Sequence, residues 1–169
     1  RGTWTQLPNM PTPRRDFGAA AFRGKVVLCG GCDRLVGEEA SLNRTLARSV
    51  DAFCPTSHAW EPLPLLMEER AEPAACNWKS TLYVCGGSVP VSGRIHRSIE
   101  VYEPSSRAWS IFGSMREPRN FLGAVAVGGQ LYLMGGFRYI GKGEAWASAE
   151  SMDLASGESR SIAPMSVCR

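Results

Sequence analysis

Short apolar runs alternate with polar segments along the whole chain, and three of these runs end in a pair of glycines. They are VVLCGG at residues 26–31, LYVCGG at 82–87 and LYLMGG at 131–136. Apolar runs of this length, bounded by glycine and polar turn residues, are typical of β-strands. The first glycines lie at positions 30, 86 and 135, close to the spacing of about 50 residues found in one class of propeller blade. The pattern therefore predicts a repeated β unit.

The repeated unit has further marks at constant offsets from the glycine pair. An arginine precedes each first glycine by 16 residues, and each of the segments SVDAF, SIEVY and SAESM has an acid at its third position. The arginines are Arg14, Arg70 and Arg119, and the acids are Asp51, Glu100 and Glu150. A tryptophan follows the first two of these segments, at Trp60 and Trp109, whereas the third copy has Ser159. Features that recur in register define a structural unit.

Each unit is expected to contain four antiparallel strands. The first would be a run of small apolar residues, 18–22 or 123–127, which suits a strand buried on both faces. Turn residues such as Arg23 and Gly24 would lead into the strand that ends in the glycine pair. The acid segment would form the third strand and the tryptophan segment the fourth. Residues 1–10 fit the outer strand of a preceding unit.

Together these marks resemble the Kelch repeats. In that family a double glycine ends the second strand, the third strand has a tyrosine two residues after an acid, and the fourth strand has a tryptophan. The middle unit has all of these marks, at Gly86, Gly87, Glu100, Tyr102 and Trp109. The other two units keep their glycine pairs but lack the tyrosine; the pairs are Gly30 with Gly31 and Gly135 with Gly136.

The resemblance implies an all-β fold in which each blade of a β-propeller has four antiparallel strands. The chain would supply about three blades of a propeller that usually has six. On this interpretation the three Kelch repeats are residues 11–66, 67–115 and 116–165, and residues 166–169 start the next blade. The chain is therefore expected to be a fragment of a longer protein.

Composition narrows the possible functions. A net charge of +3 is too small and too dispersed to indicate nucleic-acid binding, and no apolar stretch approaches the roughly 18 residues of a membrane span. Cys29, Cys76 and Cys85 fall in predicted strands, which indicates buried free thiols and a cytoplasmic location. Cys29 and Cys32 have the spacing of a zinc or redox pair, but no second pair accompanies them. The sequence predicts neither a metal site nor any other cofactor.

Two roles are open to the repeated arginines. A guanidinium that recurs in register with a carboxylate suits a structural ion pair within its own blade or with a neighbouring one. Alternatively, some of the arginines face a ligand.

The variable loops are the predicted binding surface. In antiparallel blades, the loops between second and third strands and the connections between blades emerge on one face, here called the loop face. The resemblance implies that this face holds a peptide segment of a protein partner. The candidate binding residues are Arg15, Asp16, Asp33, Arg34, Ser88, Arg94, Asn120, Phe121, Arg138 and Tyr139. The middle blade departs from the pattern with Ala71 and Glu72. A modest excess of basic residues in these loops favours an acidic or phosphorylated peptide.

Function follows from the fold and the loops rather than from any catalytic motif. The sequence predicts a protein-protein interaction module and not an enzyme, and the resemblance implies the substrate-recognition propeller of a BTB-Kelch adaptor for a ubiquitin ligase. One alternative is an actin-associated cytoskeletal Kelch protein. Another is a propeller enzyme, such as a copper oxidase or a sugar-modifying enzyme.

Overall fold

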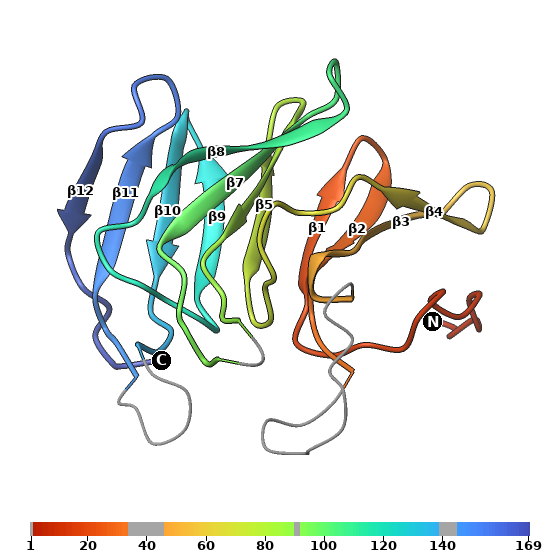
Figure 1. Ribbon diagram of the computed structural model, residues 1–169, viewed down its shortest axis with the longest axis horizontal. Coiled ribbons are helices and arrows are strands. Elements are labelled where there is room, and N and C mark those ends of the chain that lie inside the picture. The colour runs from red at the N-terminus through yellow and green to blue at the C-terminus, as the bar shows by residue number, and fades with distance from the viewer. Residues whose placement is uncertain (1, 34–45, 90–91, 139–144) are drawn as a thin grey trace.

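The computed structural model describes residues 2–33, 46–89, 92–138 and 145–169, and the strands in these ranges form three antiparallel sheets (Figure 1). The first sheet contains β1 (Gly18–Phe22), β2 (Lys25–Cys29), β3 (Val50–Cys54) and β4 (Ala59–Leu63). The second contains β5 (Ala74–Trp78), β6 (Thr81–Cys85), β7 (Ser98–Glu103) and β8 (Ala108–Ser114). The third contains β9 (Gly123–Val127), β10 (Gln130–Met134), β11 (Ala149–Asp153) and β12 (Ser159–Ile162). One short 3-10 turn, η1 (Leu46–Arg48), precedes β3.

Tight hairpins join the first two strands of each sheet, as the turn residues predicted. Arg23 and Gly24 have φ angles of 50° and 74°, and Gly128 and Gly129 have φ angles of 60° and 79°. Two successive left-handed residues suit the right-handed twist of the strands that they connect. These turns therefore fix the register of the first and third blades, whereas in the middle blade Lys79, with a φ of 53°, is the left-handed residue of the turn.

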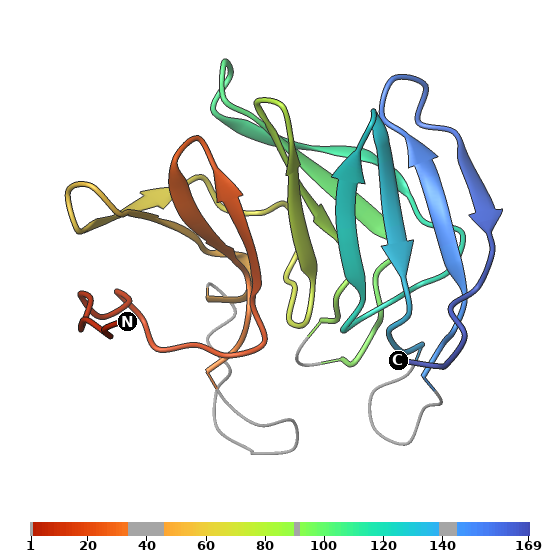
Figure 2. The ribbon, with the colours of Figure 1, turned by 180° about the vertical axis from the view of Figure 1, so that it is seen from behind.

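The three sheets stand side by side as blades, with β5 adjacent to both β1 and β9 at the inner side (Figure 2). The strand order places β4, β8 and β12 at the opposite edges of the sheets. Four-stranded meanders packed face to face around a common inner edge are the blades of a β-propeller. The predicted fold class, an all-β partial propeller, is confirmed.

The hydrophobic core lies between neighbouring blades. Strand β6 divides its side chains, because Leu82 and Val84 pack toward the first blade while Tyr83 and Cys85 pack toward the third. This alternation is the two-residue period of a strand that is covered on both faces. Each blade therefore depends on its neighbours for burial of its apolar residues.

One expectation about the inner strands is wrong. The small residues of β1 and β9 do not lie buried on both faces, since Ala19 and Ala21 are exposed and Val125 and Val127 are 46% and 55% exposed. The physical reason is that β1 and β9 each have a neighbouring blade on one side only, whereas β5 lies between the two.

Residues 2–10 form no strand, although the sequence predicted an outer strand there. A strand needs a ladder partner, and this segment pairs with none of the described strands. It nevertheless lies against the first blade, because Trp60 Nε1 donates a hydrogen bond of 3.2 Å to the carbonyl of Pro8. Trp109 Nε1 makes the equivalent bond, of 2.9 Å, to Pro64 in the connection that leaves the first blade.

Candidate functional site

Each repeated arginine is buried and pairs with the acid of its own blade. The pairs are Arg14 with Asp51, Arg70 with Glu100, and Arg119 with Glu150. The same guanidinium also donates to two carbonyl groups at the two ends of the variable loop between second and third strands. In the middle blade Arg70 Nη1 lies 2.6 Å from the Gly86 oxygen and 3.1 Å from the Ser98 oxygen. The first and third blades repeat these bonds, to Gly30 and Ser49 and to Gly135 and Ser148.

The glycine pair allows the next blade to approach closely. Gly86 has a φ of 61°, and a Cβ atom there would collide with the carbonyl oxygen of Arg119. The amide of Gly87 donates a hydrogen bond of 2.8 Å to that same oxygen, and Gly31 donates one of 2.8 Å to the oxygen of Arg70. A repeated arginine therefore holds its own blade through its side chain and the preceding blade through its backbone.

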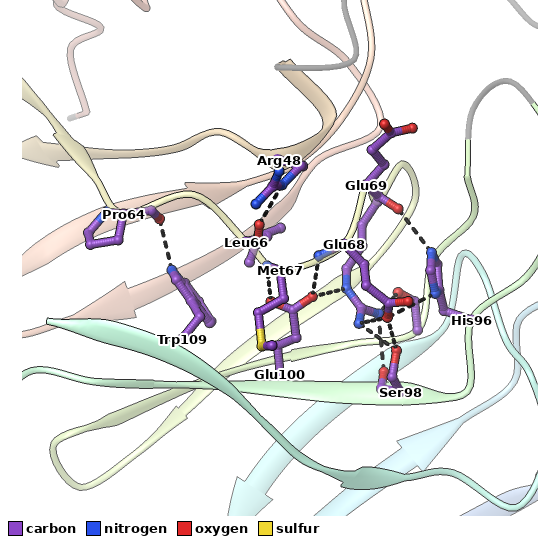
Figure 3. Close-up of polar contacts among 12 residues, drawn as sticks. Arg48, Pro64, Leu66, Met67, Glu68, Glu69, His96, Ser98, Glu100 and Trp109 are labelled. Atoms are coloured by element: carbon purple, nitrogen blue, oxygen red, sulfur yellow. Dashed lines mark hydrogen bonds and ion pairs between the residues drawn. The ribbon is translucent and has the colours of Figure 1, made fainter. Parts of the chain in front are cut away.

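Figure 3 shows the polar contacts at the joint between the first and second blades. The Arg70 and Glu100 side chains are completely buried, and Arg70 Nε lies 2.9 Å from Glu100 Oε1. The carboxylate also accepts hydrogen bonds from the amides of Met67, at 2.7 Å, and Glu68, at 3.1 Å. These bonds supply the compensation that a buried ion pair requires.

His96 and Glu68 extend this network toward the loop face (Figure 3). His96 is buried, with Nε2 2.9 Å from the carbonyl oxygen of Glu69 and Nδ1 3.3 Å from Glu68 Oε2. Burial, followed by the positive charge of Arg70, lowers the pKa of the His96 imidazole below its ordinary value. Partial burial opposes ionisation of Glu68, but the Ser98 hydroxyl and the neighbouring positive charges give its carboxyl a lowered pKa.

The first blade has a smaller version of the same site. Asp51 is one methylene shorter than glutamate, so it pairs with Arg14 Nη2 and leaves the buried Nε of Arg14 without a partner. The position that matches Met67 is Pro11, which has no amide hydrogen to donate. The shorter acid, Asp51, therefore lies beside a connecting segment that has fewer backbone amides able to donate a hydrogen bond.

The third blade adds an aromatic ring to its site. Arg119 Nε lies 3.3 Å from Glu150 Oε1, and the amide of Arg116 donates a hydrogen bond of 2.7 Å to Glu150 Oε2. The guanidinium carbon of Arg119 lies 5.0 Å from the ring centre of Trp146, within range of a cation–π interaction. Trp146 occupies the position that His96 has in the middle blade, because Trp146 lies two residues before Ser148 and His96 lies two residues before Ser98.

A chain of backbone hydrogen bonds crosses the loop face at the inner end of the blades. Asp16, Glu72 and Phe121 each lie two residues after a repeated arginine, with left-handed φ angles of 56°, 58° and 52°. The Glu72 amide donates to the Asp16 carbonyl at 2.6 Å, and the Phe121 amide donates to the Glu72 carbonyl at 2.9 Å. Such φ values are costly for residues other than glycine and are often found at binding sites. The side chains here are therefore attached to a fixed backbone.

Glu72 links the second and third blades through its carboxylate. Its Oε2 accepts hydrogen bonds from Ser88 Oγ, at 2.8 Å, and from Asn120 Nδ2, at 2.6 Å. Ser88 and Asn120, both candidate binding residues, are each 1% exposed. They support the loop face in this structure, and their contact with a partner stays a prediction.

Four of the candidate binding residues are exposed: Asp33, Arg94, Phe121 and Arg138. Phe121 is 54% exposed and packs edge to face against Phe137, with ring centres 6.2 Å apart. Arg94 extends into solvent with its Nη2 atom 3.5 Å from Glu68 Oε1.

Arg15 and Asp16 are half-buried and form an ion pair of 2.6 Å. Arg34 and Tyr139 lie outside the described residues. The structure therefore brings candidates from all three blades to the loop face, and it buries two of them.

Sequence reasoning gave no role to Glu68, His96 and Trp146, and it noted Glu72 only as a departure of the middle blade from the pattern. Glu72 has the same offset from its arginine as Asp16, and this offset was the available signal. His96 and Trp146 share an offset from the third strand but differ in chemistry, so alignment of the repeats could place them without indicating a role.

Within the ranges that the structure describes, no three histidine, cysteine or acidic side chains are grouped so that they could hold a metal ion. All six cysteines lie in these ranges and are free thiols. Burial raises the pKa of the Cys29 thiol far above its ordinary value. None of the described helices could cross a lipid bilayer.

Comparison with known proteins agrees with the repeat geometry. The Kelch motif matches three consecutive segments, residues 13–65, 69–116 and 118–166. The chain belongs to the Kelch-repeat family. Its three Kelch blades, each with a buried arginine and acid and a glycine pair, form part of a propeller of the kind that serves as a protein-interaction module.

Two further similarities are to individual proteins. The chain is similar to beta-scruin of Limulus polyphemus, with 30% identity over 136 residues, which cover 79% of this chain and 14% of that protein. It is also similar to the solved structure of YjhT, with a TM-score of 0.80 and 17% identity over 97% of this chain and 56% of that one. At this identity the second likeness shows the fold alone.

Proposed function

We propose that this Kelch chain recognises a protein partner, and that the loop face holds a peptide segment of that partner. The observation that carries the proposal is the chain of backbone hydrogen bonds through Asp16, Glu72 and Phe121, which fixes one residue of each blade on a single face. A rigid frame lowers the entropy lost on binding, because the contacting side chains are already positioned.

The exposed side chains on this face suit an acidic or phosphorylated peptide. Arg94 and Arg138 are exposed basic residues, and the exposed Phe121 packs against Phe137, the residue before Arg138. Arginine recognises carboxylate and phosphate groups with two parallel hydrogen bonds. Asp33 is the exposed acid among the described candidates.

At the level of the whole protein, we propose a substrate-recognition role in a BTB-Kelch adaptor of a ubiquitin ligase, located in the cytoplasm. The support for a reducing compartment is that all six cysteines are free and that Cys29 and Cys85 lie completely buried in strands. The proposal includes no catalytic step. An interaction module needs a shaped surface and not a reactive group.

The test is affinity capture from cell lysate with the wild-type chain and with a loop-face variant, Arg94→Glu combined with Phe121→Ala and Arg138→Glu. Proteins that depend on the loop face should be enriched by the wild type and lost with this variant. A matched control combines Lys79→Glu with Arg160→Glu, two exposed cations away from the loop face. Equal capture by all three chains would contradict the proposed surface.

The adaptor role and the actin-associated alternative are separated by the identity of what is captured. Co-sedimentation with filamentous actin, repeated with the loop-face variant, tests the alternative directly. Components of a ubiquitin ligase that co-purify with the full-length protein would support the adaptor role. Actin binding that survives every substitution in the loop face would contradict the proposed adaptor role.

A further inference from the structure

A cavity of about 380 Å³ opens between the first and second blades, close to the hairpin turns and away from the loop face. In Figure 1 these turns join β1 to β2 and β7 to β8. The floor of the cavity is apolar and is formed by Phe22, Val27, Ala52, Leu63 and Tyr102. Phe22 and Tyr102 pack edge to face, with ring centres 6.2 Å apart. A cavity of this size and lining is at the lower end of ordinary ligand pockets.

The rim of this cavity is basic. Arg23 and Lys25 come from the first hairpin and Arg107 from the turn after β7, while Glu61 is the acid that lines the cavity. Lys25 Nζ lies 2.5 Å from Glu61 Oε1, so these two charges compensate each other. Among the residues that the structure describes, neither Arg23 nor Arg107 pairs with a carboxylate. Two guanidinium groups therefore stand uncompensated beside an apolar floor.

The turn at Arg107 has the same left-handed backbone in all three blades. Arg107 has a φ of 52°, and the matching residues in the first and third blades, His58 and Gly157, have φ angles of 54° and 75°. The conformation therefore belongs to the repeat, whereas a guanidinium at this position occurs in the second blade alone.

The basic rim belongs to this joint and is not a general property of the repeat. At the matching place between the second and third blades, the lining includes Lys79 and Asp153, with Trp78 and Tyr83. One cation and one acid there replace the three cations and one acid of the first cavity. The apolar floor therefore recurs, while the excess positive charge does not.

We propose that the cavity between the first and second blades binds a short acidic peptide segment. An aromatic or aliphatic side chain of the peptide enters the apolar floor between Phe22, Leu63 and Tyr102. Carboxylates on either side of that residue pair with Arg23 and Arg107. The charge of the rim selects the acidic sequence, and the volume limits the anchor to one large side chain. This site is independent of the loop face, so either can exist without the other.

The test is fluorescence anisotropy with the 169-residue chain and a fluorescein-labelled peptide, Gly-Asp-Glu-Phe-Glu-Asp-Gly. Two companion peptides replace the acids with their amides or the phenylalanine with alanine. The double variant Arg23→Gln with Arg107→Gln should weaken binding of the acidic peptide about tenfold or more, and high salt should do the same to the wild type. Each companion peptide should also bind more weakly than the parent.

Lys79→Gln is the matched control, because it removes an exposed cation from the second joint on the same side of the molecule. It should leave the affinity unchanged, and circular dichroism should show that every variant keeps the fold. Equal binding by the wild type and the double variant would overturn the proposal, as would absence of binding to the wild type. Displacement of the peptide by free glutamate or inorganic phosphate at the peptide's own concentration would show a simple anion site and would also overturn it.

Discussion

The arginine sites of the first and second blades have the same plan but differ in how fully their charges are compensated. The Arg70 and Glu100 side chains are wholly buried. Both oxygens of the Glu100 carboxylate accept a hydrogen bond from a backbone amide, Oε2 from Met67 and Oε1 from Glu68. In the first blade the Asp51 side chain is 11% exposed, and the Nε atom of Arg14 has no partner. The difference shows that one repeated ion pair can be either a saturated buried network or a simpler pair with fewer hydrogen bonds and a slightly exposed carboxylate.

The largest effect should come from removal of the buried arginine. Arg70→Ala would leave the Glu100 carboxylate buried without its charge partner, which costs about 3–5 kcal/mol of the free energy of unfolding. Arg14→Ala should cost less, about 2 kcal/mol, because the Asp51 side chain is 11% exposed whereas that of Glu100 is wholly buried. Urea denaturation followed by tryptophan fluorescence measures both values. Lys79→Ala is the control, and equal losses for the two arginine variants would show that saturation of the network has no energetic weight.

A smaller effect is expected when charge is removed but shape is kept. Glu100→Gln places an amide group against the donors of Arg70, Met67 and Glu68, and it leaves the guanidinium without a counter-charge. We expect a loss of about 2 kcal/mol in the free energy of unfolding, against about 1 kcal/mol for Asp51→Asn. The same denaturation experiment tests this. A Glu100→Gln variant as stable as the wild type would mean that the site works through hydrogen bonds alone.

His96 gives the arginine site of the second blade a pH dependence, whereas the matching position in the first blade is Ala47, which does not titrate. The pKa of His96 in the fold lies below its ordinary value of 6.5, so the unfolded chain binds the proton first as the pH falls. Stability from this group is complete above the unfolded value and is lost below it, with a slope of at most about 1.4 kcal/mol per pH unit. Urea midpoints measured between about pH 7.5 and about pH 5.5 should fall less steeply for His96→Gln than for the wild type. Parallel slopes in the two proteins would contradict this assignment.

The smallest effect should be a gain. Asp51→Glu would bring a carboxylate oxygen within reach of the unpaired Arg14 Nε and the amide of Thr12, while Pro11 can offer no hydrogen. We expect the free energy of unfolding to rise by about 0.5–1 kcal/mol, the value of one net hydrogen bond. Thermal denaturation is sensitive enough to detect it. A loss of stability would show that the first blade has no room for the longer side chain.

The fold could be predicted in detail because its causes are local and repeated. The glycine pairs, the acid at the third position and the turn residues each occur three times, so a chance match at one copy is outweighed by the others. Exposure of Val125 and Val127 could not be predicted in this way. Their burial depends on whether another blade stands beside β9, which is a property of the assembly of blades and not of the repeat.

The candidate site was less predictable because its contacts join different repeats. The predicted contact of Ser88 and Asn120 with a partner stays a prediction, and in the structure both donate hydrogen bonds to Glu72. Their sequence positions resemble those of exposed loop residues, and only the register between the second and third blades brings the three side chains together. Position in a repeat thus indicates where a residue lies, while its partners decide what it does.

The guanidinium of each repeated arginine joins the two ends of a variable loop, since it bonds to the carbonyl before the loop and to the carbonyl after it. In the middle blade those carbonyls belong to Gly86 and Ser98. Because the ends are clamped by residues outside the loop, its length can change at little entropic cost. Each blade can therefore accept loops of different sequence and length between its second and third strands. Grafting the segment 87–97 into the third blade in place of 136–147 should move a specificity from one blade to another without rebuilding either.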